Sequence, residues 1–578
     1  MITPAAIAST ENTNSYAARI GWAVLICATL YVCYFSHLGA IGFVGPDEPR
    51  YAWIARDMVE TGDWVTPRLY GKPWFEKPPL YYWGAAICFK LFGVSEVAAR
   101  LPSAISALLA TLAMAWLAWR VYGPETARWL LLLLPTTVGM IGFSHAAATD
   151  MPFSAMVTIA IVCAAVLVGL VSDESCRDGA QHSLDPARDK AALIPGDGAV
   201  ARRRWLALIL FGLFIGLAVL AKGPATIILC GGTLFFWALF TKRWRDALRL
   251  LHPAAIATLC ATALPWYILC ARRNPDFFRI FIIEHNFKRF LTPEFQHIQP
   301  FWFYVPIFLV GIFPWLFWIS GIFSRGPENT KNREINFLAL SWALLPILFF
   351  SVSQSKLPGY ILPSIPPAIF LVARTIEMLP RSGSRAVPFA AALTGLILVC
   401  AAAWMFLSLT IAPTHSWPHE LMIPWMSVPL YIMVTGVGGL LAIGLAAYGR
   451  VHESQLIAVG AIVFILFHAE NSLLPKINPI VSPRLLAQQI RSSKPDAVYT
   501  LGIQRGWRYG LSFYLNREIS DLPETISERA LVVVDPKIFH SLEQRVSIER
   551  VDSTLWPQAQ IVAIKPLPAN TPRSGKSQ

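Results

Sequence analysis

Charged residues are scarce in this chain of 578 residues. They make up 14% of it, whereas hydrophobic residues make up 55%, and soluble globular proteins carry about 25% charged residues. An ordinary soluble globular protein is therefore excluded. Apolar runs of about 20 residues, the length that crosses a bilayer, recur from Arg19 to about His468. This composition predicts a polytopic α-helical membrane protein.

Several other signals are absent. The nine cysteines have no paired spacing, which argues against a disulfide framework or a zinc site. Residues 1–18 are polar and no small-residue cleavage pattern closes the first apolar run, so we expect the first span to remain as an anchor. We find no internal repeat. The net charge of +13 does not indicate nucleic-acid binding, because the basic residues cluster in short loops, where they set membrane orientation.

Thirteen membrane spans are predicted, with the N-terminus in the cytoplasm. Their approximate ranges are 19–42, 99–120, 127–145, 150–171, 205–221, 224–241, 250–270, 303–323, 335–352, 360–379, 387–411, 426–447 and 455–473. On this count the basic loops face the cytoplasm, as the positive-inside rule requires. The apolar segment Pro79–Gly93 is short and rich in Tyr and Trp, so we place it as a helix at the outer interface. A span at that segment would turn every later basic loop outward.

The chain divides into two predicted domains. Residues 1–475 form the transmembrane domain, including an outer loop at 44–98, and residues 476–578 form a small α/β domain on the outer side. The runs "AVYTLGI", "ALVVVDP" and "QIVAIKP" of the second domain are typical of strands. The segment 172–204, rich in Asp, Gly and Ser, is expected to be a disordered cytoplasmic insertion, and the final "TPRSGKSQ" a frayed tail.

The outer loop begins with an acidic pair. In "VGPDEPRYAWIARDM", Asp47 and Glu48 follow a Gly-Pro turn, Arg50 comes two residues later, and Tyr51 begins an apolar helical face. Asp47 either caps an interfacial helix, with Glu48 stabilising its positive end, or belongs to a functional site. The sequence leaves both readings open.

A second charged pair lies farther along the same loop. In "GKPWFEKPPLYYWG", Glu76 and Lys77 stand among aromatic residues, with Tyr81 and Tyr82 close behind. An apolar pocket with a few polar groups is the usual composition of a ligand site. The alternative is an ordinary surface ion pair.

More polar residues lie at the outer ends of later spans. Asp150 begins a span and would serve as a cap or a site acid, whereas Lys222 interrupts an apolar run and would snorkel to the headgroups or bind a ligand. "EHNFKRF" supplies Glu284, His285, Lys288 and Arg289, and "SKLPGY" supplies Lys356 and Tyr360. Glu284, His285 and His297 could bind a metal, but their spacing in the sequence matches no established ligand set. Phosphate binding would explain why so many cations are expected on the outer face: Arg50, Lys77, Lys222, Lys288, Arg289 and Lys356.

The motifs together resemble a known family. "DEPRYAWIARDMVETGDWVTPRLYGKPWFEKPP", "TDMPF", "KGP", "EHNFKRF", "PFWFYVP" and "SKLPGYILP", in this order and at these separations, closely resemble the aminoarabinose transferases of the bacterial lipid A pathway. These are polyprenyl-phosphate-dependent GT-C glycosyltransferases, related to protein mannosyltransferases. The resemblance is carried by motifs from Val44 to Pro363, and "DEPRYA" alone would indicate only the broad class.

The resemblance implies a GT-C fold in the bacterial inner membrane with its site facing the periplasm. The expected reaction transfers 4-amino-4-deoxy-L-arabinose from undecaprenyl phosphate to a lipid A phosphate, with inversion at the sugar. This modification of lipid A confers resistance to cationic peptides such as polymyxin. Two residues match the family's acids, Asp47 and Asp150, and Glu76 and Lys77 match its Glu-Lys pair. The expected partners are the undecaprenyl phosphate-linked donor, lipid A and membrane lipids, and the chain is expected to be a monomer. No cofactor is expected, although a divalent metal near the site stays an open alternative.

The expected chemistry is the stabilisation of a leaving phosphate by preorganised cations, for which Lys77, Lys356 and Arg50 are the candidates. The acceptor phosphate is already ionised near neutral pH, so Asp47 would orient or stabilise, whereas a hydroxyl acceptor would make it a general base. Asp150 or Glu76 would pair with the ammonium group of the sugar.

Two alternatives remain from the sequence. One is a GT-C transferase with another polyprenyl-phosphate sugar or a protein hydroxyl acceptor. The other is a flippase or transporter of lipid-linked sugars, which would favour charges in mid-span and related halves. Neither feature is visible in this sequence.

Overall fold

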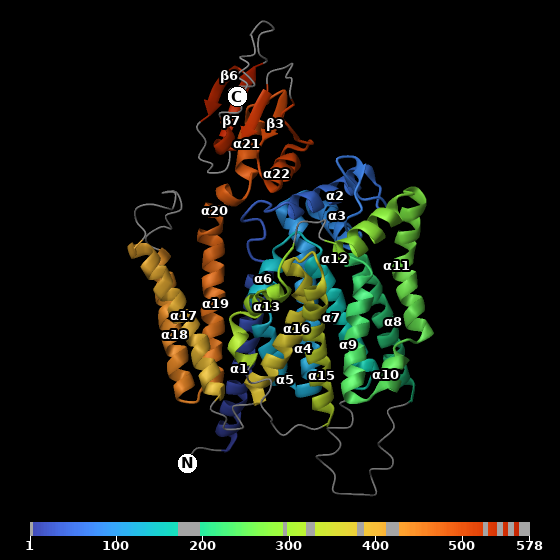
Figure 1. The fold of residues 1–578 in the computed structure, drawn as a ribbon. Coiled ribbons are helices and arrows are strands. Elements are labelled where there is room, and N and C mark those ends of the chain that lie inside the picture. The colour runs from blue at the N-terminus through green and yellow to red at the C-terminus, as the bar shows by residue number, and fades with distance from the viewer. Residues whose placement is uncertain are drawn as a thin grey trace.

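Long helices form a bundle with a small sheet at one end (Figure 1). The computed structural model describes residues 4–171, 197–292, 298–319, 330–378, 386–411, 427–523, 530–539, 547–552 and 560–565. The expected tail and most of the expected insertion, residues 172–196, lie outside these ranges, as does His297.

The helices are α1 (Pro4–Tyr34), α2 (Asp47–Thr61), α3 (Leu80–Phe92), α4 (Glu96–Tyr122), α5 (Pro124–Leu133), α6 (Val138–Ser144), α7 (Asp150–Leu167), α8 (Asp197–Lys222), α9 (Ala225–Thr241), α10 (Trp244–Arg249), α11 (Pro253–Arg273), α12 (Arg289–Leu291), α13 (Tyr304–Ile312), α15 (Thr330–Val352), α16 (Ile365–Met378), α17 (Ala386–Ile411), α18 (Ser427–Ala447), α19 (Val451–Ser472), α20 (Leu474–Val481), α21 (Arg484–Ser492) and α22 (Arg505–Leu515). The strands are β1 (Arg68–Leu69), β2 (Lys72–Pro73), β3 (Ala497–Leu501), β4 (Ser520–Asp521), β5 (Ala530–Val534), β6 (Ser547–Asp552) and β7 (Gln560–Lys565). A π-helical segment, Arg279–Lys288, precedes α12.

The apolar helices match the predicted spans in position. Within the described ranges, eight helices are long and apolar enough to cross a membrane, and the bent pair α5 and α6 would make a ninth. The other predicted spans coincide with shorter apolar helices at Arg19–Tyr34, Ala225–Thr241, Phe301–Ile312 and Val387–Ala403. A polytopic architecture is therefore confirmed, while the number thirteen stays a prediction.

The predicted span at 127–145 is not one straight helix. Helices α5 and α6 are bent by 62° at a short break. Pro135 lies in this break, and α5 ends before it because proline lacks the backbone N–H that would continue the helix. Thr137 then starts α6, its hydroxyl accepting a hydrogen bond from the Met140 N–H.

Helix α3 corresponds to the segment that we placed at the interface. Its 13 residues extend about 20 Å, which is shorter than the hydrocarbon core of about 30 Å. It lies beside α2 at the end of the bundle that faces the sheet (Figure 1), and the ring centroids of Tyr51 and Tyr82 are 5.7 Å apart. The two helices therefore form one aromatic layer on that end.

The C-terminal unit (the described residues from Leu474 onward) contains a five-stranded sheet with the order β4-β3-β5-β7-β6. Strands β4, β3 and β5 are parallel, and β7 and β6 are added antiparallel. The strands predicted from "AVYTLGI", "ALVVVDP" and "QIVAIKP" are β3, β5 and β7. The sequence missed β4, which has two residues, and β6, which lies at the edge of the sheet.

The C-terminal unit is held on the bundle by hydrogen bonds to the chain that leads into α2. The backbone N–H of Gly42 donates to Asn478 Oδ1 at 2.8 Å, and the N–H of Phe43 donates to the Tyr514 hydroxyl at 2.8 Å. Arg56 of α2 donates to the Phe513 carbonyl at 3.1 Å. Helix α22 therefore lies directly against α2.

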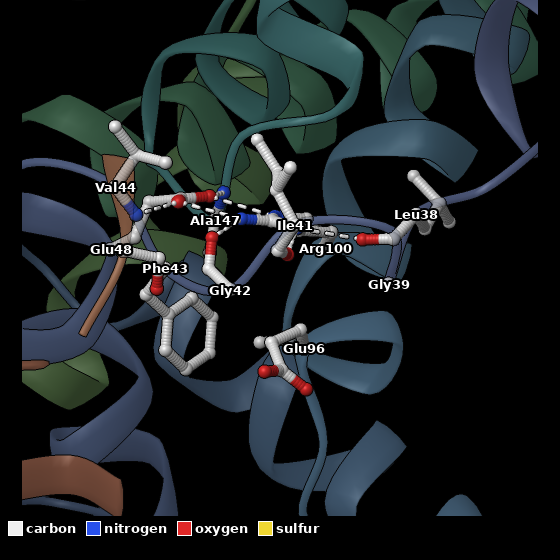
Figure 2. A network of polar contacts seen from close by, with 12 residues as sticks. Leu38, Gly39, Ile41, Gly42, Phe43, Val44, Glu48, Glu96, Arg100 and Ala147 are labelled. Carbon is white, nitrogen blue, oxygen red and sulfur yellow. Dashed lines mark hydrogen bonds and ion pairs between the residues drawn. The ribbon is translucent and has the colours of Figure 1, made fainter. Parts of the chain in front are cut away.

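A buried ion pair fixes the start of α2 (Figure 2). The Arg100 guanidinium contacts both carboxylate oxygens of Glu48, at 2.9 and 2.8 Å, and donates to the carbonyls of Leu38, Ile41 and Gly42. Glu48 also accepts hydrogen bonds from the N–H groups of Val44 (2.8 Å) and Ala147 (2.7 Å). The pair thus ties the chain after α1, the start of α2 and the loop before α7 to α4. Glu48 therefore does more than stabilise the positive end of a helix, because it holds several segments together through Arg100.

We expect Glu48→Ala to lower the free energy of unfolding by about 3–5 kcal/mol, because it leaves the buried Arg100 guanidinium without its carboxylate. The measurement is thermal unfolding in detergent. Glu60→Ala is the control, because Glu60 lies on the same helix, is largely exposed and reaches Arg56 only at 3.9 Å. Equal unfolding temperatures for the two variants would contradict the structural role of the pair.

Candidate active site

Asp47 lies in the first turn of α2 but does not cap it. The residue at the cap position is Pro46, and no side chain makes a capping hydrogen bond there. The Asp47 carboxylate instead pairs with Arg50, one turn farther along. About half of the Asp47 side chain is exposed (48%), whereas the Arg50 side chain is 3% exposed. Asp47 therefore presents a carboxylate at the surface of a buried charged cluster.

Glu76 lies between two arginines. Its Oε2 is 3.1 Å from Arg50 Nη1 and its Oε1 is 3.3 Å from Arg289 Nη1. Burial alone would raise the pKa of Glu76, but the charges of Lys77, Arg50 and Arg289 outweigh it and lower that pKa to about 2. Glu76 is therefore ionised at every physiological pH, and it joins the outer loop to the chain at α12.

The adjacent Glu76 and Lys77 form no ion pair with each other in the described part of the chain, so the surface-pair alternative is wrong. Burial is the main reason that the pKa of Lys77 is lowered to about 8, and the charge of Arg289 lowers it further, against the attraction of Glu76. Lys222 and Asp150 also act on its charge. Among the residues that the structure describes, Lys77 has no hydrogen-bond acceptor. Its ammonium group is therefore available to a ligand.

Asp150 and Lys222 form a largely buried ion pair between α7 and α8. Lys222 Nζ lies 2.5 Å from Asp150 Oδ1, and the same ammonium sits over the rings of Phe153 (5.1 Å) and Tyr360 (4.6 Å). Asp150 makes no capping hydrogen bond, so neither the cap nor the snorkelling alternative describes this pair. Gly359 packs against it, because a Cβ at residue 359 would lie 2.4 Å from Asp150 Oδ1.

The aromatic residues of the predicted site have different positions. Tyr51 and Tyr82 are buried beside the charged cluster, and the Tyr82 hydroxyl has no hydrogen-bond partner within the described ranges. The Tyr81 hydroxyl instead donates to the Ala99 carbonyl at 2.8 Å. Tyr81 therefore has a structural contact, whereas Tyr82 offers a hydroxyl to the site.

Lys356 is not brought into the cluster by any contact that the structure describes. Its side chain is buried, and its ammonium donates to the Ser353 carbonyl three residues earlier. The predicted phosphate clamp of Lys77, Lys356 and Arg50 is therefore not assembled as a unit. Its near neighbour Tyr360 does reach the site, through Lys222.

His285 is half-buried in the π-helical segment. Burial lowers the pKa of His285, and the nearby Lys77 lowers it further, against the attraction of Glu76. Glu284 pairs with Arg279 at 2.7 Å, while Lys288 is exposed. In the described part of the chain, no group of three or more His, Cys, Asp or Glu residues is arranged to hold a metal.

Three contributions were missed or underweighted in the sequence. Arg289 was noted only as one more outer cation, but it binds Glu76 directly. Gly359 was not singled out, and only its contact with Asp150 shows its importance. Tyr509 of α22 lies with its ring centroid 5.4 Å from the Arg50 guanidinium. No local sequence signal could have found it, because more than 450 residues separate the two.

Comparisons with known proteins support the resemblance. The pattern of the dolichyl-phosphate-mannose-protein mannosyltransferase family matches residues 76–172 and 196–281. The undecaprenyl phosphate-alpha-4-amino-4-deoxy-L-arabinose arabinosyl transferase of Aeromonas salmonicida is 32% identical over 68% of this chain and 67% of its own length. The protein of the same name from Edwardsiella ictaluri is 31% identical over 63% of this chain, and the match spans 61% of that relative's length.

The solved structures agree on the fold. The crystal structure of ArnT from Cupriavidus metallidurans bound to undecaprenyl phosphate matches 94% of this chain and 98% of its own, with a TM-score of 0.71 and 24% sequence identity. The expected GT-C architecture is thereby confirmed. From the sequence match to the Aeromonas protein, the chain belongs to the family of undecaprenyl phosphate-alpha-4-amino-4-deoxy-L-arabinose arabinosyl transferases.

Proposed function

We propose that this chain transfers 4-amino-4-deoxy-L-arabinose from undecaprenyl phosphate to a phosphate group of lipid A, at a site on the periplasmic side of the inner membrane. The observation that carries the proposal is the uncommitted ammonium of Lys77 beside the Asp150–Lys222 pair, at the end of the bundle where α2 lies. A largely buried cation without a partner is suited to a lipid phosphate. Membership of the arabinosyl transferase family supplies the sugar and the lipid carrier.

The role of each cation in the transfer depends on whether a carboxylate of the protein already neutralises it. A phosphate oxygen of the acceptor attacks C1 of the sugar, the bond from C1 to the undecaprenyl phosphate oxygen breaks, and the electron pair leaves with that phosphate. Lys77 is placed to stabilise the charge that develops there. Arg50 and Arg289 are committed to Glu76, and Lys222 to Asp150. These pairs therefore hold the site in shape around Lys77.

Asp47 receives the role of orienting the aminosugar. The sequence suggested Glu76 or Asp150 for its ammonium group, but both are paired with cations, whereas Asp47 keeps about half of its surface exposed. No base is needed, because a phosphate monoester is already ionised near neutral pH. With a protein hydroxyl as acceptor, the same carboxylate would act as the base.

A flippase for lipid-linked sugars is less well supported. The buried charges described above lie at one end of the helices, beside the C-terminal unit, and no transport path through the middle of the bundle is lined by them. The basic helix α10 lies at the opposite end of the bundle (Figure 1). This separation of basic loop and site agrees with a periplasmic site under the positive-inside rule.

We expect Asp47→Asn to fold normally, because the carboxylate caps no helix and its loss removes only a partly exposed ion pair. We expect it to abolish most of the transfer, because the variant lacks the carboxylate that orients the aminosugar. The measurement is mass spectrometry of lipid A from cells that express the chain, which should gain the mass of the aminosugar with the wild type and lose it with the variant. Asp276→Asn is the control, since Asp276 is an exposed acid paired with Arg279. Wild-type modification by Asp47→Asn would refute the assigned role, and unmodified lipid A with the wild type would refute the proposed function.

We expect activity to fall as the pH rises through about 8. The pKa of Lys77 is about 8, so its side chain is cationic below that pH and neutral above it, when it no longer stabilises the leaving phosphate. The measurement is kcat/KM for the donor against pH, which reports on the free enzyme. Lys77→Arg keeps its charge and should be slower but lack this decline. The same decline in the arginine variant would assign it to another group.

The sidedness on which the site depends can be tested with single cysteines. With all nine native cysteines replaced, Lys72→Cys should react with a membrane-impermeant thiol reagent added from the periplasm, and Arg245→Cys should not. Both positions are exposed, so accessibility does not limit the reaction. The opposite result would place the site in the cytoplasm.

A further inference from the structure

Three arginines surround one tyrosine where the C-terminal unit meets α2. The guanidinium carbons of Arg50, Arg505 and Arg508 lie 5.4, 5.5 and 5.9 Å from the centroid of the Tyr509 ring. The ring face attracts each cation, but the like charges repel one another. Three arginines can stay this close together where anions neutralise their charges.

Two of the three arginines have their anions within the protein. Arg50 pairs with Asp47 and Glu76, and Arg508 Nη1 lies 2.6 Å from Asp521 Oδ2. Arg505 is exposed, and within the described ranges it makes no ion pair and no hydrogen bond from its side chain. The cluster therefore holds one uncompensated guanidinium, and it is the one that faces solvent.

Arg505 lies near the carboxyl end of a parallel strand. It begins α22, directly after the parallel strand β3, and open α/β sheets bind ligands outside the carboxyl ends of their parallel strands. This edge of the sheet adjoins the loop that leads into Asp47. A Cβ at Gly506 would lie 2.9 Å from the Gly45 carbonyl carbon, so the two backbones are in direct contact.

We propose that Arg505 binds a phosphate of the acceptor lipid and holds it over the start of α2 for transfer. This inference rests on the proposed function. A guanidinium presents a planar fork of donors that matches phosphate oxygens. Arg505 belongs to the C-terminal unit, outside the helix bundle, whereas Lys77 lies deeper, in the loop that we assign to the donor phosphate. The acceptor is therefore the source of the phosphate at Arg505.

The test is steady-state transfer by the full chain in detergent, with undecaprenyl phosphate-linked aminosugar as donor and purified lipid A as acceptor. We expect Arg505→Ala to raise the acceptor KM about tenfold, since it removes a charge-assisted hydrogen bond, and to leave the donor KM unchanged. Arg505→Lys should recover part of the loss, because it restores the charge without the fork.

Lys494→Ala is the matched control. Lys494 is an exposed cation of the same unit, but it precedes β3 and so lies at the opposite end of that strand. Its removal should leave both KM values unchanged. An equal rise in acceptor KM for Lys494→Ala and Arg505→Ala would show a general charge effect and would overturn the assignment.

A second variant tests the same site through its position. Gly506→Ala should push α22 away from Gly45 and should also raise the acceptor KM, with Arg505 still present. An unchanged acceptor KM in Arg505→Ala, or a rise in the donor KM instead, would overturn the inference while leaving the proposed function intact. No transfer to lipid A by the wild-type chain would refute the proposed function itself.

Discussion

The ion pair between Glu48 and Arg100 is the constraint on which the arrangement of the site depends. A buried charge is costly unless it is paired and its remaining hydrogen-bonding groups are satisfied. Arg100 meets this condition only because three backbone carbonyls and Glu48 converge on it, and Glu48 in turn holds the Ala147 N–H. Asp47 and Asp150 lie on two of the segments joined in this way. Their separation is therefore set by a residue of α4 that touches neither of them.

The charged residues of the site are not all paired with one another. Within the described ranges, Asp47 and Glu76 pair with Arg50, Glu76 also pairs with Arg289, and Asp150 pairs with Lys222. The pairs that form are those with the closest geometry, and Lys77 is left over. A largely buried cation without a partner is unfavourable for the protein alone and favourable once an anion enters. Under the proposed function, this arrangement sacrifices some stability for affinity toward a phosphate.

The sequence predicted the helices because bilayer-crossing runs are a strong signal, and it singled out Asp47, Glu76, Lys77, Asp150 and Lys222, which the structure brings near one another, because polar residues at the ends of such runs stand out. Geometry between distant segments was beyond its reach. Lys356 looked equivalent to Lys77 by composition, but a nearby carbonyl holds its ammonium. Tyr509 and Arg505 belong to the C-terminal unit, where charged and aromatic residues are common. Only the contact of α22 with α2 distinguishes these two residues from the others. The bend at Pro135 was readable in principle, but the apolar run on both sides of it concealed the break.

The sheet order has a consequence for how the protein is made. Strand β7 lies between β5 and β6, although it is the last described strand in the chain. Strand β5 is buried along its whole length, and it cannot be covered on that side until the ribosome has delivered residues 560–565. The helices of the bundle, in contrast, can enter the membrane as they emerge. During biogenesis the membrane part can therefore be complete before the C-terminal unit closes over α2.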